Sequence, residues 1–167
     1  MILEAKQIWS ALEFRMPMLL RQVEPLGRAQ MLWVPGPGRV SIAWQLWHIA
    51  EVEDVWVRDL ILNEDLEFPF GLQVREAERD DQYPTKSELL SYLQDVRVMT
   101  KKRLESATSG EFERLVEDRD FGRIAVRDVW SGVITSFAWH AGQVALTAKL
   151  LPDSPVEVME FGYWKRK

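Results

Sequence analysis

Apolar residues recur at helical spacing in four long stretches of the chain. Apolar side chains three or four positions apart lie on one face of an α-helix, so this spacing predicts an amphipathic helix. The first stretch covers about residues 3–26, and its pattern is carried by Ile8, Leu12, Leu19 and Val23. Pro17 lies inside this stretch and predicts a kink or a break, because proline lacks the N–H that the helix ladder needs.

The second predicted helix follows a connection with the sequence VPGPGR at 34–39, whose prolines and glycines exclude a helix. Ser41 is a suitable N-cap, and the helix is expected to run from there to about Asn63. Its apolar residues cover most of the circumference: Ile42, Ala43, Trp44, Leu46, Trp47, Ile49, Val52, Val55, Trp56 and Leu60. A helix that is apolar nearly all round is packed on more than one side.

The third and fourth helices are bounded by long polar connections. Residues 64–84 are polar and irregular, and Thr85 with Glu88 then forms a capping box, which predicts a helix from there to about Ala107. Residues 108–124 are read as another polar connection that contains no strand. The fourth helix is expected from about Ala125 to Leu151, because Pro152 stops it.

Four long helices without a convincing strand predict an all-α fold, a four-helix bundle in which residues 1–167 form a single domain. The connections are long for a simple up-down bundle, which favours a crossover topology. The segment after Pro152 is too short for a domain of its own. Its aromatic residues predict that it packs on the bundle or on a partner chain: Phe161, Tyr163 and Trp164.

The composition of the chain argues against several classes of function and of site. The net charge of −5 and the pI near 5.2 argue against the basic face of a nucleic-acid-binding protein. The absence of cysteine excludes disulfides, thiolate nucleophiles and zinc–cysteine sites, and it fits a reducing compartment. The N-terminal residues lack the apolar core of a signal peptide, and no apolar run approaches the roughly 20 residues that span a bilayer. We therefore expect a cytoplasmic protein that binds neither nucleic acid nor membranes.

Eight tryptophans are the most unusual feature of the composition. Tryptophan buries a large apolar area and keeps an N–H that needs a partner. Most of the eight are expected in the core or in an interface. The alternative is that some of them line a ligand cavity.

The two histidines, His48 and His140, lie on different predicted helices. At about 100° per residue, the face of His48 also carries Trp44, Val52 and Val55, with Glu51 at its flank. The face of His140 carries Val133, Ser136, Val144 and Thr147, with Phe137 and Gln143 to either side. Both faces are mostly apolar, so we expect both imidazoles to point into the bundle, where such folds hold metals.

Two histidines are too few for an ordinary catalytic metal, which has three protein ligands and an open position. Glu51 is the best-placed third donor, because residues three apart are neighbours on a helix, and two histidines with one carboxylate suit Fe(II), Zn or Ni. The alternative is a pair of hydrogen-bonded core histidines. A Ser136–His140 nucleophile pair is only weakly supported, because no orienting acid lies nearby in the sequence.

Two segments of the chain, SIAWQLWHIAEVEDVW and IAVRDVWSGVITSFAWHAGQVALTAKLL, resemble the DinB/YfiT-like four-helix-bundle family. The strongest elements are the histidine early in the second helix and an H-x-G-Q element formed by His140, Gly142 and Gln143. The resemblance covers essentially the whole chain. It implies a bundle that is often homodimeric, with a divalent metal held by three histidines. In some members it also implies a transferase or isomerase activity that uses low-molecular-weight thiols.

Carried onto this sequence, the resemblance gives His48 and His140 as two metal ligands, whereas Ser136 occupies the third ligand position. A serine hydroxyl stays protonated at neutral pH and is a poor ligand. We therefore expect a degenerate, two-histidine metal site, with a structural role or with a small ligand bound in a pocket lined by Trp44, Ser136, Phe137 and Gln143. The alternative is a transferase or hydrolase that depends on Zn, Ni or Fe, held by His48, His140 and a carboxylate such as Glu51. The expected partners are a second copy of the chain and a small molecule or thiol.

Overall fold

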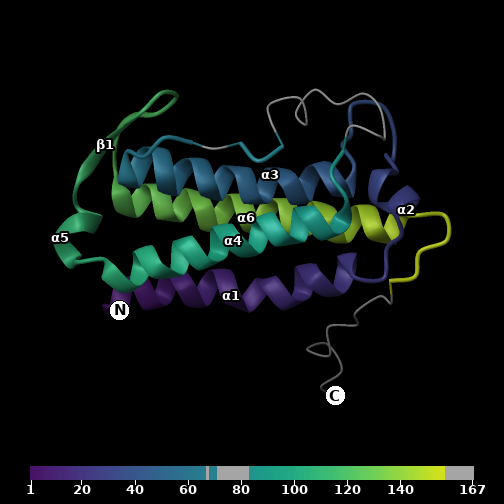
Figure 1. Ribbon diagram of the computed structural model, residues 1–167, viewed down its shortest axis with the longest axis horizontal. Coiled ribbons are helices and arrows are strands. Elements are labelled where there is room, and N and C mark those ends of the chain that lie inside the picture. The colour runs from purple at the N-terminus through teal and green to yellow at the C-terminus, as the bar shows by residue number, and fades with distance from the viewer. Residues whose placement is uncertain (67, 71–82, 157–167) are drawn as a thin grey trace, which may run out of the picture.

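The computed structural model describes residues 1–66, 68–70 and 83–156 of the chain, and four long helices packed side by side dominate it (Figure 1). The long elements are α1 (Leu3–Val23), α3 (Ile42–Asp54) continued by η1 (Val55–Leu62), α4 (Lys86–Ser106) and α6 (Val126–Leu150). The short elements are α2 (Arg28–Leu32), α5 (Ser109–Phe112), β1 (Leu115–Asp118) and β2 (Gly122–Ala125). The predicted all-α four-helix-bundle fold is confirmed. The prediction for Phe161, Tyr163 and Trp164 lies outside the described residues.

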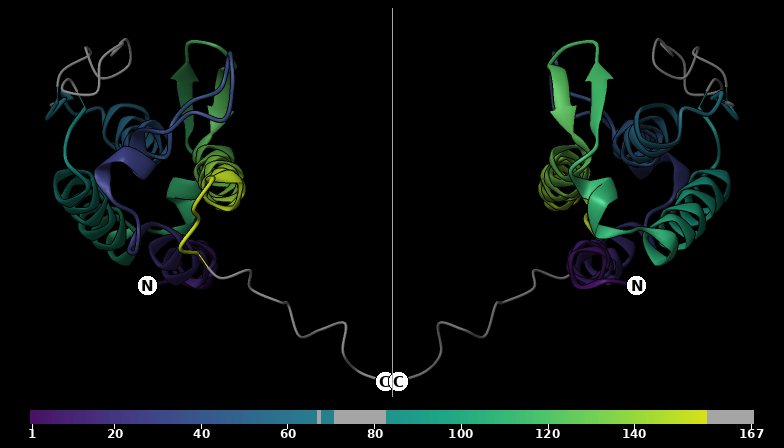
Figure 2. Two further views of the ribbon diagram at one scale, coloured as in Figure 1. Left: turned by 90° about the vertical axis from the view of Figure 1, so that its right-hand side faces the viewer. Right: turned by 90° about the vertical axis from the view of Figure 1, so that its left-hand side faces the viewer.

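The helices are connected by crossovers rather than in simple up-down order. Around the bundle, α3 packs mainly against α6 and α4, and α1 packs mainly against the same two helices. Helices α1 and α6 run in one direction and α3 and α4 in the other, as the colour sequence in Figure 1 shows, and Figure 2 views the bundle end-on. Because α3 and α4 are parallel neighbours, the chain between them has to return along the length of the bundle. The crossover expected from the long connections is therefore present.

The helix boundaries follow local signals that the sequence contains. The predicted N-cap is confirmed, since the Ser41 hydroxyl accepts the Trp44 N–H at 3.1 Å. Helix α1 ends at Val23 rather than at residue 26, because Pro25 has no N–H with which to continue the ladder. Pro17 lies inside α1 and does not break it. Ten of the thirteen residues of α3 are buried, which confirms that this helix is packed on more than one side.

Helix α4 begins with the predicted capping box. The Thr85 hydroxyl accepts the Glu88 N–H, and a Glu88 carboxylate oxygen accepts the Thr85 N–H at 2.7 Å. These reciprocal bonds satisfy two N–H groups that the first helical turn leaves without partners.

Replacing Thr85 by alanine is expected to lower the free energy of unfolding by about 1 kcal/mol, because the capping acceptor is lost. Urea unfolding followed by circular dichroism measures this change. Ser87→Ala, at an exposed position one residue into the same helix, is the control and is expected to change stability little. Equal effects of the two substitutions would contradict the capping role.

The expectation that residues 108–124 contain no strand is wrong. Strands β1 and β2 pair antiparallel, with Leu115 opposite Ala125 and Asp118 opposite Gly122. The turn is closed by one Asp118 carboxylate oxygen, which accepts the N–H groups of Asp120 and Phe121 at 2.8 Å each. Gly122 follows the turn with a φ of 69°, a conformation that glycine adopts without a steric penalty. Four-residue strands are too short to show a reliable alternation in the sequence.

One charged cluster lies inside the bundle. Arg97 of α4 and Glu53 of α3 are both 2% exposed, and Arg97 Nε lies 3.1 Å from Glu53 Oε2. The Thr100 hydroxyl donates to Glu53 Oε1 at 2.6 Å, and the Arg97 guanidinium lies 4.3 Å from the centre of the Phe137 ring. Burial raises the pKa of the Glu53 carboxyl, although the Arg97 charge opposes this shift. The pair ties α3 to α4 across the core.

The tryptophans are distributed between the core and the surface. Trp47 and Trp130 are buried, whereas Trp9, Trp33, Trp44 and Trp56 are only partly buried. Trp139 of α6 is 66% exposed, and Trp164 lies outside the described residues. The partly buried tryptophans are thus available to line surface hollows. Among the helices that the structure describes, none is both long and apolar enough to cross a membrane.

Candidate functional site

The two histidines, separated by most of the chain, meet where α3 and α6 pack against each other. Their ring centroids are 4.6 Å apart, and the ring planes make an angle of 79°. The contact arises because α3 and α6 are antiparallel neighbours and each carries its histidine near the middle. Trp44 stacks on His48 one turn earlier in α3, with centroids 4.5 Å apart and an angle of 24°. A tryptophan and two imidazoles thus form one aromatic cluster.

The two imidazoles, predicted to point into the bundle, lie partly buried between two of its helices and not in the fully buried core. The His48 side chain is 25% exposed, and His140 is also only partly buried. The side of α3 that faces the bundle interior is already occupied by buried residues such as Leu46, Ile49 and Glu53. The imidazoles therefore lie along the line where α3 meets α6, within reach of solvent and of a ligand.

Gln45 fixes the orientation of the His140 ring. His140 Nδ1 lies 2.5 Å from Gln45 Oε1. Because an amide oxygen can only accept, Nδ1 carries the proton and Nε2 keeps its lone pair. Gln45 is 3% exposed, so the contact is shielded from water. Gln45 was not among the predicted site residues, although an amide within an otherwise apolar turn, three residues before His48, is a signal for such a role.

A carboxylate lies beside the equivalent atom of His48. Glu51 Oε2 is 3.6 Å from His48 Nδ1, and the Glu51 side chain is 2% exposed. Each imidazole has an oxygen on its Nδ1 side, but only the His140 contact is a hydrogen bond, and His48 Nδ1 has no hydrogen-bond partner among the described residues. In both rings Nε2 is the nitrogen left for another partner. Acceptors at the second ring nitrogen are typical of histidines that bind metals, since they set the tautomer and the ring orientation.

The pKa of His140 is lowered to about 4, first because burial disfavours the charged ring and second because His48 lies close by. The folded chain therefore holds this imidazole neutral at pH 7. A histidine in the unfolded chain titrates near 6.5. Between these two values the unfolded chain binds more protons, so the contribution of His140 to stability is lost as the pH falls from about 6.5 towards about 4.

Titration of the chain followed by NMR of the imidazole signals is expected to show one histidine that changes protonation near pH 4. His140→Gln identifies that signal by its disappearance. Because the shift comes from the folded environment, the same signal is expected to return to an ordinary value in urea. A His140 signal that titrates near 6.5 in the folded chain would contradict the shielded, neutral imidazole.

The remaining predicted site residues differ in how deeply they are buried. Ser136 and Gln143, on the turns of α6 to either side of His140, are partly buried. Phe137 is buried in the core, where it contacts Arg97 and not the imidazoles. Within residues 1–66, 68–70 and 83–156, no three histidine, aspartate or glutamate side chains come together in a group that can hold a metal ion. The site thus brings two imidazoles together, with the Glu51 carboxylate 3.6 Å from one of them and Ser136 one helical turn before the other.

Comparison with known proteins gives the family. A model of the DinB superfamily matches residues 11–147, which is most of the chain. The chain belongs to the DinB superfamily. None of the curated proteins matches the sequence.

Two solved structures are similar to this DinB-superfamily chain. A conserved protein from Enterococcus faecalis is 15% identical, with a TM-score of 0.73 over 90% of this chain and 97% of that one. YfiT from Bacillus subtilis is 17% identical, with a TM-score of 0.69 over 87% of this chain and 86% of its own. YfiT is described as a probable metal-dependent hydrolase with an unusual four-helix bundle topology. At these identities the likeness concerns the fold alone.

Proposed function

We propose that this DinB-superfamily chain binds a small ligand at the imidazole pair and does not use a tightly held catalytic metal. The observation that carries the proposal is the residue at position 136. Ser136 lies one helical turn before His140, where a third nitrogen donor would complete the ligand set that the family resemblance implies. A neutral hydroxyl contributes little to holding a divalent cation.

The donor set does not fit a catalytic divalent metal. Such a metal takes three protein ligands and keeps one position open, and His48 and His140 supply two. Glu51 Oε2 approaches His48 from the Nδ1 side at 3.6 Å, beyond hydrogen-bond distance, and not from the Nε2 side that would face a metal.

The same atoms suit a small organic ligand. With Nδ1 of His140 engaged by Gln45, its Nε2 is an acceptor, and the Ser136 hydroxyl can donate or accept. Trp44 adds a flat apolar surface beside the rings. A planar molecule with an apolar body and a hydrogen-bond donor matches this mixture, because small-molecule sites combine apolar surface with a few polar groups that fix orientation.

The proposal is tested by elemental analysis of the untagged full chain, expressed with zinc, nickel, iron and manganese supplied. We expect well below one metal ion per chain after dialysis. A parallel NMR titration with phenol, compared with anisole, is expected to shift the imidazole signals more strongly with phenol, which can donate. Stoichiometric metal, or equal shifts with both probes, would overturn the proposal.

A second candidate function is a divalent-metal-dependent transferase or hydrolase. It is favoured by one observation: both histidines have an oxygen beside Nδ1 and leave Nε2 for a metal. YfiT, which is similar in fold, is described as a probable metal-dependent hydrolase. A bound metal would polarise a substrate or water. Stoichiometric zinc, nickel or iron in the elemental analysis would favour this candidate over the first.

A further inference from the structure

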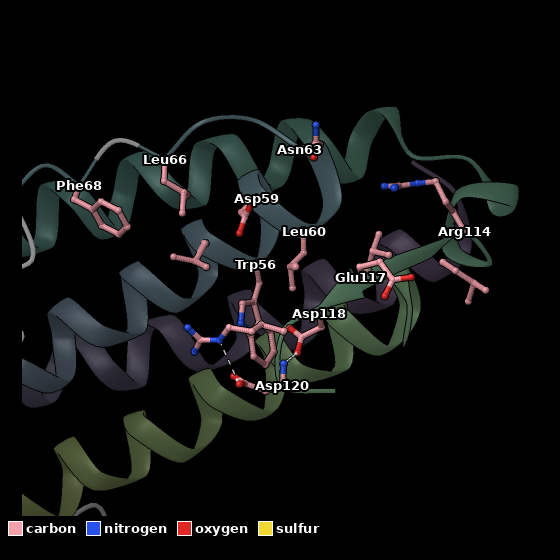
Figure 3. A pocket seen from close by; sticks show the side chains of 14 residues that line it. Trp56, Asp59, Leu60, Asn63, Leu66, Phe68, Arg114, Glu117, Asp118 and Asp120 are labelled. Carbon is pink, nitrogen blue, oxygen red and sulfur yellow. Dashed lines mark hydrogen bonds and ion pairs between the residues drawn. The ribbon is translucent and has the colours of Figure 1, made fainter. Parts of the chain in front are cut away.

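A hollow of about 740 Å³ opens between η1 and the β1–β2 hairpin, away from the imidazole pair (Figure 3). A second hollow of about 350 Å³ adjoins it on the α6 side. The two hollows share Trp56 and Leu60 of η1 and Asp118 of β1. Figure 3 shows Trp56 between η1 and α6, with Asp59 on one side of the indole and Asp118 and Asp120 on the other. Three elements thus enclose a space large enough for a small organic molecule.

Trp56 is held in place by the helix opposite. A Cβ added at Gly132 of α6 would lie 1.9 Å from Trp56 Cζ3, so only glycine lets the indole pack against α6 at this position. The residues around Trp56 form a π-helix, which is rare and is often found at functional sites. Trp56 is only partly buried, so part of the ring remains open to the hollow.

The wall opposite the indole is acidic. The larger hollow is lined by four carboxylates and two arginines, and each arginine has a partner within the protein. Arg114 donates to the carbonyl oxygen of Ile61, and Arg119 pairs with Asp120. The Glu117 carboxylate pairs with Arg123 at 3.3 Å. The four carboxylates of the lining outnumber its two arginines, and Arg123 offsets one of the two carboxylates in excess.

Two of these carboxylates keep oxygens that face no cation. Asp118 uses one oxygen, Oδ1, for the two N–H groups of its own turn. Asp118 Oδ2 and Asp59 make no ion pair with any residue that the structure describes. An aromatic surface beside unpaired carboxylates attracts a positive charge, through the ring quadrupole and through direct electrostatic attraction.

We propose that this hollow is a binding site for a small organic cation, with Trp56 contacting the cationic group and Asp59 and Asp118 neutralising it. The site is separate from the imidazole pair. Gly132 precedes His140 by eight residues, which places the two sites about 12 Å apart along α6. Binding at Trp56 therefore does not depend on a metal or on the ligand proposed for the histidines.

The test is an NMR and calorimetric titration of the full chain with benzyltrimethylammonium, a permanent cation with an aromatic ring. We expect saturable binding with a dissociation constant of about 1 mM or tighter, with the indole N–H signal of Trp56 shifted most. Trp56→Leu identifies that signal. Benzyl alcohol and benzoate are the neutral and anionic comparisons and are expected to bind at least about tenfold more weakly, because the attraction of the ring and of the carboxylates is lost.

Matched variants separate the parts of the site. Asp59→Asn and Asp118→Asn keep the size of each side chain, and each is expected to weaken binding and to reduce its dependence on salt. Asp153→Asn removes the same charge at an exposed position far along the chain and is expected to leave the affinity unchanged. Equal binding of the cation and benzyl alcohol, no binding of the cation, or a largest shift at Trp139 in place of Trp56 would each overturn the proposal.

Discussion

Replacing Ser136 by histidine is expected to raise the affinity of the chain for zinc by about a hundredfold or more. Removing a group that only hydrogen-bonds to a metal-binding histidine already lowers metal affinity about 10–100-fold. A residue that binds the metal directly is expected to contribute at least as much. The new imidazole would lie one turn before His140, on the line where α6 meets α3, and His48 is already in contact with His140. Two donors would become three, which is the number that catalytic zinc sites use.

The measurement is a calorimetric zinc titration of the parent and the Ser136→His chain. Thr135→His places the same group on the exposed face of α6 and is the matched control, with an expected affinity close to that of the parent. Circular dichroism establishes that all three chains are folded. If Ser136→His and Thr135→His bind zinc equally weakly, position 136 is not the missing ligand position, and the interpretation of the site is wrong.

Replacing Glu53 by glutamine is expected to lower the free energy of unfolding by about 3–5 kcal/mol, because it leaves the Arg97 charge buried without a counter-charge. Glutamine keeps the volume of the side chain and can still accept from the Thr100 hydroxyl. The loss therefore reports the charge and not a cavity. Urea unfolding measures it, and Glu105→Gln, an exposed carboxylate on α4, is expected to change stability little.

A double variant separates two contributions to the free energy of unfolding: the destabilisation by an unpaired buried charge and the net stabilisation by the intact ion pair. Glu53→Gln with Arg97→Met removes both charges from the core, and it is expected to recover much of the loss, since an ion pair replaced by neutral groups is often close to neutral in stability. If Glu53→Gln alone costs less than about 1 kcal/mol, the pair is better solvated than its burial indicates. A double variant that is no more stable than Glu53→Gln would show that packing, rather than charge, determines the loss.

The features that the sequence predicted are those with local causes. Ser41 caps α3 through the Trp44 N–H, and Thr85 and Glu88 cap each other within one turn. The apolar pattern then locates the long helices to within a few residues. The long connections favoured a crossover order, because antiparallel neighbouring helices need only short loops between them. The family resemblance also predicts which helices are neighbours in the bundle. Hydrophobic periodicity does not, because it shows only which face of each helix is apolar.

The features that the sequence did not predict depend on contacts between distant segments. Glu53 and Arg97 come together only because α3 and α4 are neighbours. Gln45 gains its role only when His140 arrives from α6. The π-helical turns of η1 continue an apolar pattern that fits an α-helix equally well. An apolar face indicates a fully buried side chain only when it is the single apolar face of its helix, whereas α3 is apolar almost all round.

Isothermal titration of zinc into the unaltered, untagged chain distinguishes a small-ligand site from a metal site at the imidazole pair. We predict no saturable binding of one zinc ion per chain at micromolar concentration, because His48 and His140 supply only two nitrogen donors and Ser136 does not supply a third. Tight binding of one zinc ion per chain, abolished by His140→Gln, would contradict this account. It would show that the two imidazoles still hold a metal, as the second candidate function requires.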